Sequence, residues 1–396
     1  MRPTILGLCL TLALTLPAWC GDEECTTAVI AEGATHDGRP ILWKNRDTDS
    51  PSNKVVYVRE TPYAYLAVVD AQYPSGRVAW GGLNERGFAV INSMSYNLPH
   101  QGGEYSDLEG LIMAEALRKC ATIDDFELYI KANLGPEFGS RANFCVIDAQ
   151  GGAAIFEVHN HGYRRLNADT TAERYLLNTN FSRSGPADKG LGYLRFDRET
   201  ELFASQPAGS LSHTFVLQTV ARDLGHALLR SPSRADWKSL PAAQPYWVHS
   251  NYTINRGITA SVILIHGVKK GEDPANATLW VMLGEPVCSI ATPLWVSAGD
   301  TPPELREGEE APIAHEAARL KKILRPLNGD DRKEYVDVTR LDNASGTGWL
   351  PGNLRLEGDI LSQCEEFCSR RPSPAERAGF QKDAAARVLA RLQAVR

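Results

Sequence analysis

The chain has 396 residues, of which 43% are hydrophobic and 23% are charged, values that fit a folded globular protein and argue against a disordered one. Its formal net charge is -6, and no stretch gathers lysine and arginine into a basic stripe, so nucleic acid is not an expected partner. The length allows either two domains or one large domain with a terminal extension.

Residues 1–20 have the pattern of a secretory signal peptide. Arg2 supplies a positive start, and the apolar run ILGLCLTLALTLPAW is too short for a comfortable membrane span. Ala18 and Cys20 then stand like the small residues of a cleavage site. A lipid-modified Cys20 is the alternative, which Trp19 disfavours because a small residue is expected there. The signal predicts export to the periplasm or the extracellular space, with no stable membrane insertion after cleavage.

Strand patterns dominate the stretch that follows this leader. The runs TTAVIAEG and PILWKNRD flank ATHDGR, in which Asp37 and Gly38 are a strong signal of a two-residue hairpin turn. Such a turn would place Asp47 opposite Ala28. The hairpin is therefore expected to return residues 44–47 towards the start of the first strand.

Helices and further strands follow in an order that indicates the fold class. Two helices are expected, one along residues 108–116 and one from Thr122, which has acidic residues in its first turn. Strands return as a hairpin around residues 149–152, as RYLLNTNFS, and as the late pair TASVILIHGV and ATLWVMLGEP. The pattern predicts an α+β fold, with antiparallel sheets packed together and helices outside. From about residue 301 the chain becomes charged, helical and interrupted by proline.

The remaining cysteines and histidines do not indicate a metal site. Cys364 and Cys368 could share a helix face, but no histidine lies nearby in the sequence to complete a zinc site. His159 and His161 alternate along a strand, and no third ligand is evident. Disulfide pairing cannot be deduced from the irregular cysteine spacings. We expect no metal and no organic cofactor.

Cys25 lies shortly after the leader, and the hairpin returns a polar cluster to it. Strand alternation puts Lys44 and Arg46 on one face, and Asn45 and Asp47 on the other. A nearby cation lowers the pKa of a thiol. If the chain were cut before Cys25, the new α-amino group, with an unperturbed pKa of about 7.7–8.0, could act as general base. A buried structural cysteine or half of a disulfide remains the alternative.

The stretch CTTAVIAEGATHDGRPILWKNRDTD resembles the start of N-terminal-nucleophile hydrolases that cleave linear amides. These include choloylglycine hydrolases, penicillin V acylases, isopenicillin-N acyltransferase-like enzymes and cysteine dipeptidases. The resemblance implies an αββα sandwich, proteolytic exposure of the cysteine, Cys25 as the nucleophile and Asp47 as the group that holds its amine. The family's arginine falls on Lys44, which keeps the charge but loses the bidentate fork. Arg46 is the other cation that could take that role.

Three later segments agree with the resemblance. GLNERGFAVINSMS resembles the family's G-x-N-x-x-G turn and the strand after it, which implies Asn84 in the turn and Asn92 near the site. LLNTNFS resembles the segment with the oxyanion-hole asparagine, which implies Asn180, with Asn178 as the competing choice. NRGITASVILIHG resembles a late strand that begins with a functional arginine in some members, which implies Arg256.

The resemblance therefore implies an exported amidohydrolase that cleaves the linear amide bond of a small N-acyl substrate through an acyl-enzyme on Cys25. The expected organisation is a signal peptide at 1–20, a short propeptide at 21–24, a catalytic domain at 25–300 and a charged helical extension at 301–396. Acyl transfer from the same intermediate and dipeptidase-like activity remain alternatives. A non-catalytic exported binding or scaffold protein, anchored through Cys20, is a further one. Homo-oligomer formation is left open.

Overall fold

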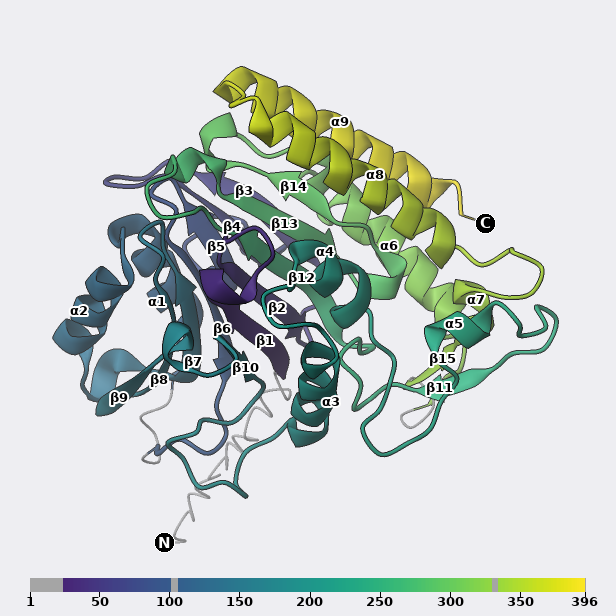
Figure 1. Ribbon diagram of the computed structural model, residues 1–396, viewed down its shortest axis with the longest axis horizontal. Helices are drawn as coiled ribbons and strands as arrows, with labels where there is room; N and C mark the ends of the chain where they lie inside the picture. The colour runs from purple at the N-terminus through teal and green to yellow at the C-terminus, as the bar shows by residue number, and fades with distance from the viewer. Residues whose placement is uncertain (1–23, 101–105, 330–333, 396) are drawn as a thin grey trace, which may run out of the picture.

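Two antiparallel sheets lie face to face at the centre of the computed structural model, which describes residues 24–100, 106–329 and 334–395 (Figure 1). The first sheet has six strands in the order β10 (Tyr175–Asn178), β1 (Cys25–Ile30), β2 (Ile41–Asp47), β12 (Thr259–His266), β13 (Thr278–Leu283) and β14 (Thr292–Leu294). The second has seven strands in chain order, β3 (Asn53–Val58), β4 (Tyr65–Asp70), β5 (Gly81–Asn84), β6 (Ala89–Met94), β7 (Arg141–Ile147), β8 (Ala153–His159) and β9 (Gly162–Asn167). A separate pair joins β11 (Trp247–His249) to β15 (Tyr335–Asp337).

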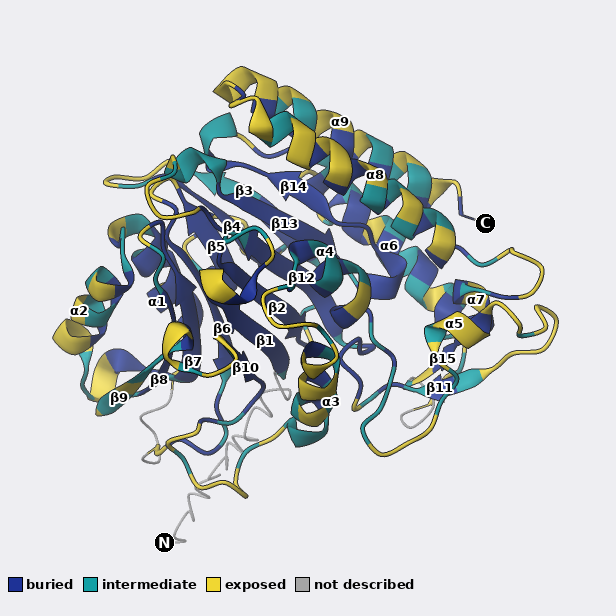
Figure 2. Ribbon diagram, viewed as in Figure 1, coloured by how far each residue is buried: buried dark blue, intermediate teal, exposed yellow. Residues whose placement is uncertain are grey.

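The inner faces of the two sheets share one hydrophobic core. Val29 and Leu42 of the first sheet belong to the same buried cluster as Leu66, Ile91 and Ile155 of the second. Strands that are buried on both sides read as nearly continuous apolar runs, as β12 does in TASVILIH. Figure 2 shows most strands of both sheets buried, except for the edge strand β9 and part of β3, and it shows helices with exposed outer faces around them.

Helices cover the outer face of each sheet. On the second sheet lie α1 (Glu109–Lys119) and α2 (Ile123–Asn133), and Phe126 packs edge-on against Phe156 at a centroid distance of 5.3 Å. Around the first sheet lie α3 (Tyr193–Ala204), α6 (Pro312–Leu324), α8 (Leu350–Ser369) and α9 (Pro374–Gln393), with the short helices α4 (His213–Phe215), α5 (Arg234–Trp237) and α7 (Val338–Leu341) between them. The predicted α+β class and its αββα layering are confirmed.

The charged C-terminal segment is part of this outer layer. Helix α9 packs against β14, and α6 against β13. Leu320 and Val388 are fully buried members of the same core as the strands beneath them. Trp295, just after β14, packs against the rings of Phe367 and Phe380 at centroid distances of 5.8 Å each. The segment after residue 301 therefore shares its hydrophobic core with the first sheet.

The connection from β1 to β2 differs from the predicted two-residue turn. Strand β1 ends at Ile30 and β2 begins at Ile41, so Cys25 lies opposite Arg46, and Asp47 does not lie opposite Ala28. The intervening loop is held by a neighbouring segment, because the Leu211 carbonyl accepts from the His36 N–H at 3.0 Å. Pairing outside the hairpin thus replaces the tight turn that the Asp-Gly pair indicates.

The predicted alternation along β2 holds despite this longer loop. Lys44 and Arg46 extend towards residues of the second sheet, which supplies their hydrogen-bond acceptors Trp80 and Asp70. Asn45 donates instead to the Ala221 carbonyl at 2.9 Å, on the other side of the first sheet. The strand period of two therefore separates the groups as expected.

The predicted leader at residues 1–20, and the propeptide apart from Glu24, lie outside the described residues. Across 24–100, 106–329 and 334–395, no helix combines the length and apolarity that a membrane crossing needs.

Candidate active site

Cys25 is the first residue of β1, a strand flanked on both sides within the six-stranded sheet. It is buried, and hydrogen bonds hold both of its peptide groups. Its N–H donates to Asn180 Oδ1 at 2.9 Å, and its carbonyl accepts from Arg195 Nη1 at 2.7 Å. The backbone around the thiol is therefore fixed by side chains from two other elements.

Asn180, the residue proposed from the sequence as the oxyanion donor, lies just beyond β10. Its Oδ1 accepts from Cys25 and from Arg195 Nη2, at 2.9 and 2.8 Å, while its Nδ2 donates to the Met94 carbonyl at 3.1 Å. Asn180 therefore contacts the Cys25 backbone through its oxygen. The competing Asn178 lies opposite Thr27 and donates to Ser93 Oγ at 3.2 Å.

Arg195 is a site residue that the sequence analysis missed. Besides Cys25 and Asn180, its guanidinium donates to Thr26 Oγ1 at 2.9 Å and to Glu24 Oε2 at 2.5 Å. It lies in the first turns of α3, and the spacing of four to Glu199 and Phe203 marks one buried face of this helix. That spacing is the signal that could have placed Arg195 inward, because residues four apart share a helix face.

Gly192 allows this close packing at the start of α3. Its φ is +80°, and a Cβ there would lie 2.6 Å from Arg195 Nη2 and 2.8 Å from Thr179 Oγ1. Glycine is the residue that tolerates both the left-handed backbone and the missing space.

Asp47 lies at the end of β2, in a fully buried ion cluster. It accepts from Thr259 Oγ1 at 2.7 Å and pairs with Arg256 Nη1 at 3.3 Å. An irregularity between Thr259 and Ser261 shifts the β2–β12 register there, as β-bulges next to active sites often do. Burial raises the pKa of the Asp47 carboxyl against the opposing charges of Arg256 and Arg195.

Arg256, proposed from its place before the late strand, also belongs to this cluster. Besides Asp47, it pairs with Glu24 Oε2 at 3.3 Å and donates to Asn251 Oδ1 at 2.7 Å. Burial alone would lower its pKa, but the carboxylates of Asp47 and Glu24 raise it. The fold thus brings Asp47 and Arg256 within contact of each other and of the residue before Cys25.

Lys44 and Asn92 meet between the sheets. The Lys44 ammonium donates to Asn92 Oδ1 at 2.6 Å and to the Trp80 carbonyl at 3.1 Å. These acceptors lie just past the last pair of the β5–β6 ladder, Gly81 with Ile91, where the strands separate. Asn92 therefore acts in this state as an acceptor for Lys44.

Arg46 is directly opposite Cys25 in the β1–β2 register, but its charge is engaged elsewhere. Its Nη1 donates to Asp70 Oδ1 at 2.8 Å, and its guanidinium lies 4.4 Å from the Trp80 ring centroid. The indole of Trp80 in turn donates to Asp70 Oδ2 at 2.8 Å. Asp70 and the Trp80 ring thus engage Arg46, as Asn92 and the Trp80 carbonyl engage Lys44.

Asn84 occupies the β5–β6 turn as proposed. Its Oδ1 accepts from the Arg86 and Phe88 N–H groups, and its Nδ2 donates to the Leu117 and Cys120 carbonyls at 2.8 and 2.7 Å. It therefore also ties the turn to the C-terminal end of α1.

Other cysteines have surroundings unlike those of Cys25. Burial raises the pKa of Cys120 and of Cys145 to about 12 in each case. Cys364 and Cys368 share one face of α8, as proposed, and their sulfurs form a hydrogen bond at 4.0 Å and no disulfide. In the described parts of the chain, no three His, Cys, Asp or Glu side chains are placed to hold a metal ion.

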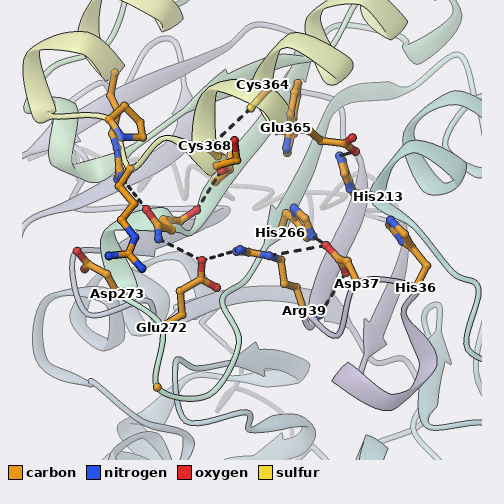
Figure 3. A pocket seen from close by; sticks show the side chains of 18 residues that line it. His36, Asp37, Arg39, His213, His266, Glu272, Asp273, Cys364, Glu365 and Cys368 are labelled. Carbon is orange, nitrogen blue, oxygen red and sulfur yellow. Dashed lines mark hydrogen bonds and ion pairs between the residues drawn. The ribbon is translucent and has the colours of Figure 1, made fainter.

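A cavity of about 710 Å³ lies away from Cys25 (Figure 3). The β1–β2 connection, the β12–β13 connection and the α8–α9 turn line it, with side chains that include Asp37, Glu272 and Cys368. Arg39 bonds Glu272 at 2.5 Å across one side of the cavity. Since Cys25 begins β1 and the cavity borders the loop after its end, this volume is separate from the thiol.

No protein-family model matches the chain, and no curated protein sequence matches it. Among solved structures, the chain is similar to the Caenorhabditis elegans ortholog of N-acylethanolamine-hydrolyzing acid amidase, with 13% identity, a TM-score of 0.41, and coverage of 61% of this chain and 92% of that one. The chain is also similar to a variant of the conjugated bile acid hydrolase from Clostridium perfringens, with 12% identity and a TM-score of 0.38. The match covers 65% of this chain and 89% of that one. Penicillin V acylase from Agrobacterium tumefaciens has 15% identity and a TM-score of 0.36, and the match covers 68% of this chain and 86% of that one.

The last two of these enzymes are of the kinds that the motif at Cys25 resembles.

Proposed function

We propose that this protein is an exported amidohydrolase that cleaves a linear amide bond with Cys25 as an N-terminal nucleophile. The observation that carries the proposal is the convergence on one cysteine peptide of Asn180 and Arg195, with the buried Asp47–Arg256 pair beside it. Buried charges are costly unless they are paired or used, and such clusters concentrate at functional sites.

Activation begins with cleavage of the Glu24–Cys25 bond. The thiol attacks the Glu24 carbonyl carbon, a C–S bond forms, the C–N bond breaks, and the Cys25 nitrogen takes the thiol proton. Water then hydrolyses the thioester, which frees the thiol and leaves Cys25 with an α-amino group. Asp47, whose N–H already donates to the Glu24 carbonyl at 3.0 Å, lies where it can orient that amine.

Catalysis repeats this chemistry on a small N-acyl amide. The Cys25 amine takes the thiol proton, the thiolate attacks the substrate carbonyl, and the amine returns the proton to the leaving nitrogen. Asn180 and Asn92 are the proposed oxyanion donors, and Asn180 Nδ2 would turn from Met94 towards the substrate. A donor of this kind contributes about 2.7–4 kcal/mol to transition-state stabilisation. Interception of the acyl-enzyme by an amine would make the same site an acyltransferase.

The N-terminus of the exported protein tests the activation step. Intact-mass measurement should find a chain that begins at Cys25, and the Cys25→Ala protein should keep Glu24. A mature wild-type chain that retains Glu24 would contradict the proposal, and a lipid on Cys20 would favour the anchored alternative.

Removal of the thiol tests the nucleophile. Cys25→Ala should lower hydrolysis of a panel of N-acyl amino acids, penicillins, bile conjugates and dipeptides by at least about a thousandfold, as loss of a catalytic nucleophile does. The matched control is Cys120→Ala, a buried cysteine at the C-terminal end of α1, which should keep the activity. Equal activity of the two variants would rule out Cys25 as the nucleophile.

A further inference from the structure

Glu24 is bound by the site although it precedes the proposed nucleophile. Its Oε2 accepts from Arg195 Nη2 at 2.5 Å and pairs with Arg256 Nη1 at 3.3 Å. Two buried guanidinium groups thus bind the carboxylate of a residue that the proposed cleavage removes. The Glu24 carboxylate therefore marks a position where the folded chain can bind a carboxylate.

The three side chains differ in burial, and Glu24 is the one that solvent reaches most. The exposed fractions are 1% for Arg195, 6% for Arg256 and 16% for Glu24. The Nε atoms of both arginines have no hydrogen-bond partner within the described residues. Two buried cations thus face a position that solvent reaches through Glu24.

Cleavage after Glu24 changes the charge in this pocket. Arg195 loses the carboxylate with which it pairs, and Arg256 keeps Asp47. The new α-amino group adds no negative charge. Asp47 and Glu199 still lie near enough to act on Arg195, but the carboxylate that accepts its hydrogen bond is gone. A buried cation that loses such a partner favours an anion in its place.

We propose that Arg195 and Arg256 form an acyl-side carboxylate pocket, which Glu24 fills in the uncut chain and a substrate carboxylate fills after cleavage. This inference rests on the proposed function and names its substrate class. Glu24 stands on the acyl side of the bond that breaks, so its side chain marks where the acyl group of a substrate lies. The preferred substrates are amides of dicarboxylic acyl groups, with glutaryl or an N-terminal glutamyl residue matching the spacing of Glu24.

The pocket can be tested without any catalysis. In the full chain, Cys25→Ala keeps the peptide before residue 25 intact, and adding Glu24→Gly removes the whole side chain that fills the pocket. Propionate, which has the shape of the missing side chain, should bind the double variant in calorimetry at least tenfold more tightly than propionamide. It should not bind the Cys25→Ala single variant, whose pocket Glu24 still fills.

Arginine variants assign the binding. In the double-variant background, Arg195→Gln should abolish propionate binding and Arg195→Lys should retain part of it. Since Arg195 also holds the Cys25 carbonyl, Arg256→Gln provides a second variant in case the first does not fold. Absence of propionate binding, or equal binding with Glu24 present, would overturn the pocket.

Substrate preference tests the acyl-side assignment in the processed wild-type protein. The glutaryl amide of 4-nitroaniline should have a kcat/KM at least a hundredfold above that of the pentanoyl amide, and Arg195→Gln should remove this preference. Equal kcat/KM values for the two amides would overturn the assignment. If no amide is cleaved and the chain stays uncut, the proposed function fails, and propionate binding still decides whether the pocket exists.

Discussion

The Lys44 ammonium lies between the two sheets, where two oxygen atoms from the second sheet accept its hydrogen bonds. Lysine is a compact point charge on a flexible stem, and it suits this gap between Trp80 and Asn92. At the residue scale, the position of this lysine is therefore defined by the two acceptors that its ammonium meets.

Lys44→Met should destabilise the fold, because it leaves the Asn92 Oδ1 atom and the Trp80 carbonyl without their donor. Each unsatisfied buried acceptor should lower the free energy of unfolding by about 1–3 kcal/mol. Denaturation in urea measures this loss. If Lys44 also activates the thiol, the pH midpoint of thiol labelling at Cys25 should rise in the same variant.

The control for this change is Lys119→Met, an exposed lysine at the end of α1. Its free energy of unfolding should stay within about 0.5 kcal/mol of the wild type. An unchanged labelling midpoint in Lys44→Met would show that Lys44 has only a structural role.

At the scale of elements, a buried carboxylate of α8 binds segments that are distant from it in sequence. Glu357 accepts from Arg222 Nη1 and Nη2 at 2.8 and 2.7 Å, and also from the Ala291 N–H at 2.6 Å. The exposed fractions of both side chains in this ion pair are 0%. The bidentate geometry fixes α8 against the segment before β14.

Glu357→Gln should therefore lower the free energy of unfolding by about 3–5 kcal/mol, because it leaves the Arg222 guanidinium buried without its counter-charge. Denaturation in guanidinium chloride measures the change. Glu366→Gln on the exposed face of the same helix is the control, and it should have little effect. Similar losses in the two variants would mean that α8 is not fixed by this pair.

At the scale of the whole molecule, the cavity in Figure 3 joins segments that are distant in sequence, and His213 lies on its wall. The His213 ring stacks on His266 at a centroid distance of 4.3 Å and lies 4.0 Å from Glu365 Oε1. Burial lowers the pKa of His213 well below its ordinary value, and the neighbouring His266 lowers it further. The Asp37 carboxylate opposes this, without overcoming it.

This burial predicts the direction of a pH effect on stability. The folded chain keeps His213 neutral, while the unfolded chain binds a proton below about pH 6.5. Protons therefore favour unfolding. Protonation of His213 in the unfolded chain should lower the free energy of unfolding by up to about 1.4 kcal/mol for each pH unit below 6.5.

Unfolding in urea between pH 7 and pH 5 tests the effect, which His213→Gln should remove. The control is His315→Gln, an exposed histidine on α6, which should keep the wild-type slope. Asp37 does not affect the slope between pH 7 and pH 5. The hydrogen bond from His266 lowers its pKa, so its contribution to the free energy of unfolding is lost only below about pH 3.9. A wild-type slope in His213→Gln would contradict the prediction.

Much of the fold followed from local patterns in the sequence. Apolar runs and turn residues predicted the hairpin at 149–152 and the late strand pair, and Thr122 begins α2 with a capping box as its sequence indicates. The connection at Asp37 was predicted wrongly, because Leu211 pairs with the loop and no short-range pattern contains that contact.

The sequence by itself determined the order of elements, the alternation along β2 and the choice of Cys25 and Asp47 as candidates, since each depends on neighbours along the chain. Only the tertiary structure decided that Arg195 faces Glu24, a partner 171 residues away. An arginine on a helix is expected in solvent until the surface against which the helix packs is known. The local sequence pattern therefore identified the cysteine, whereas the arginine next to it could be placed only from long-range packing.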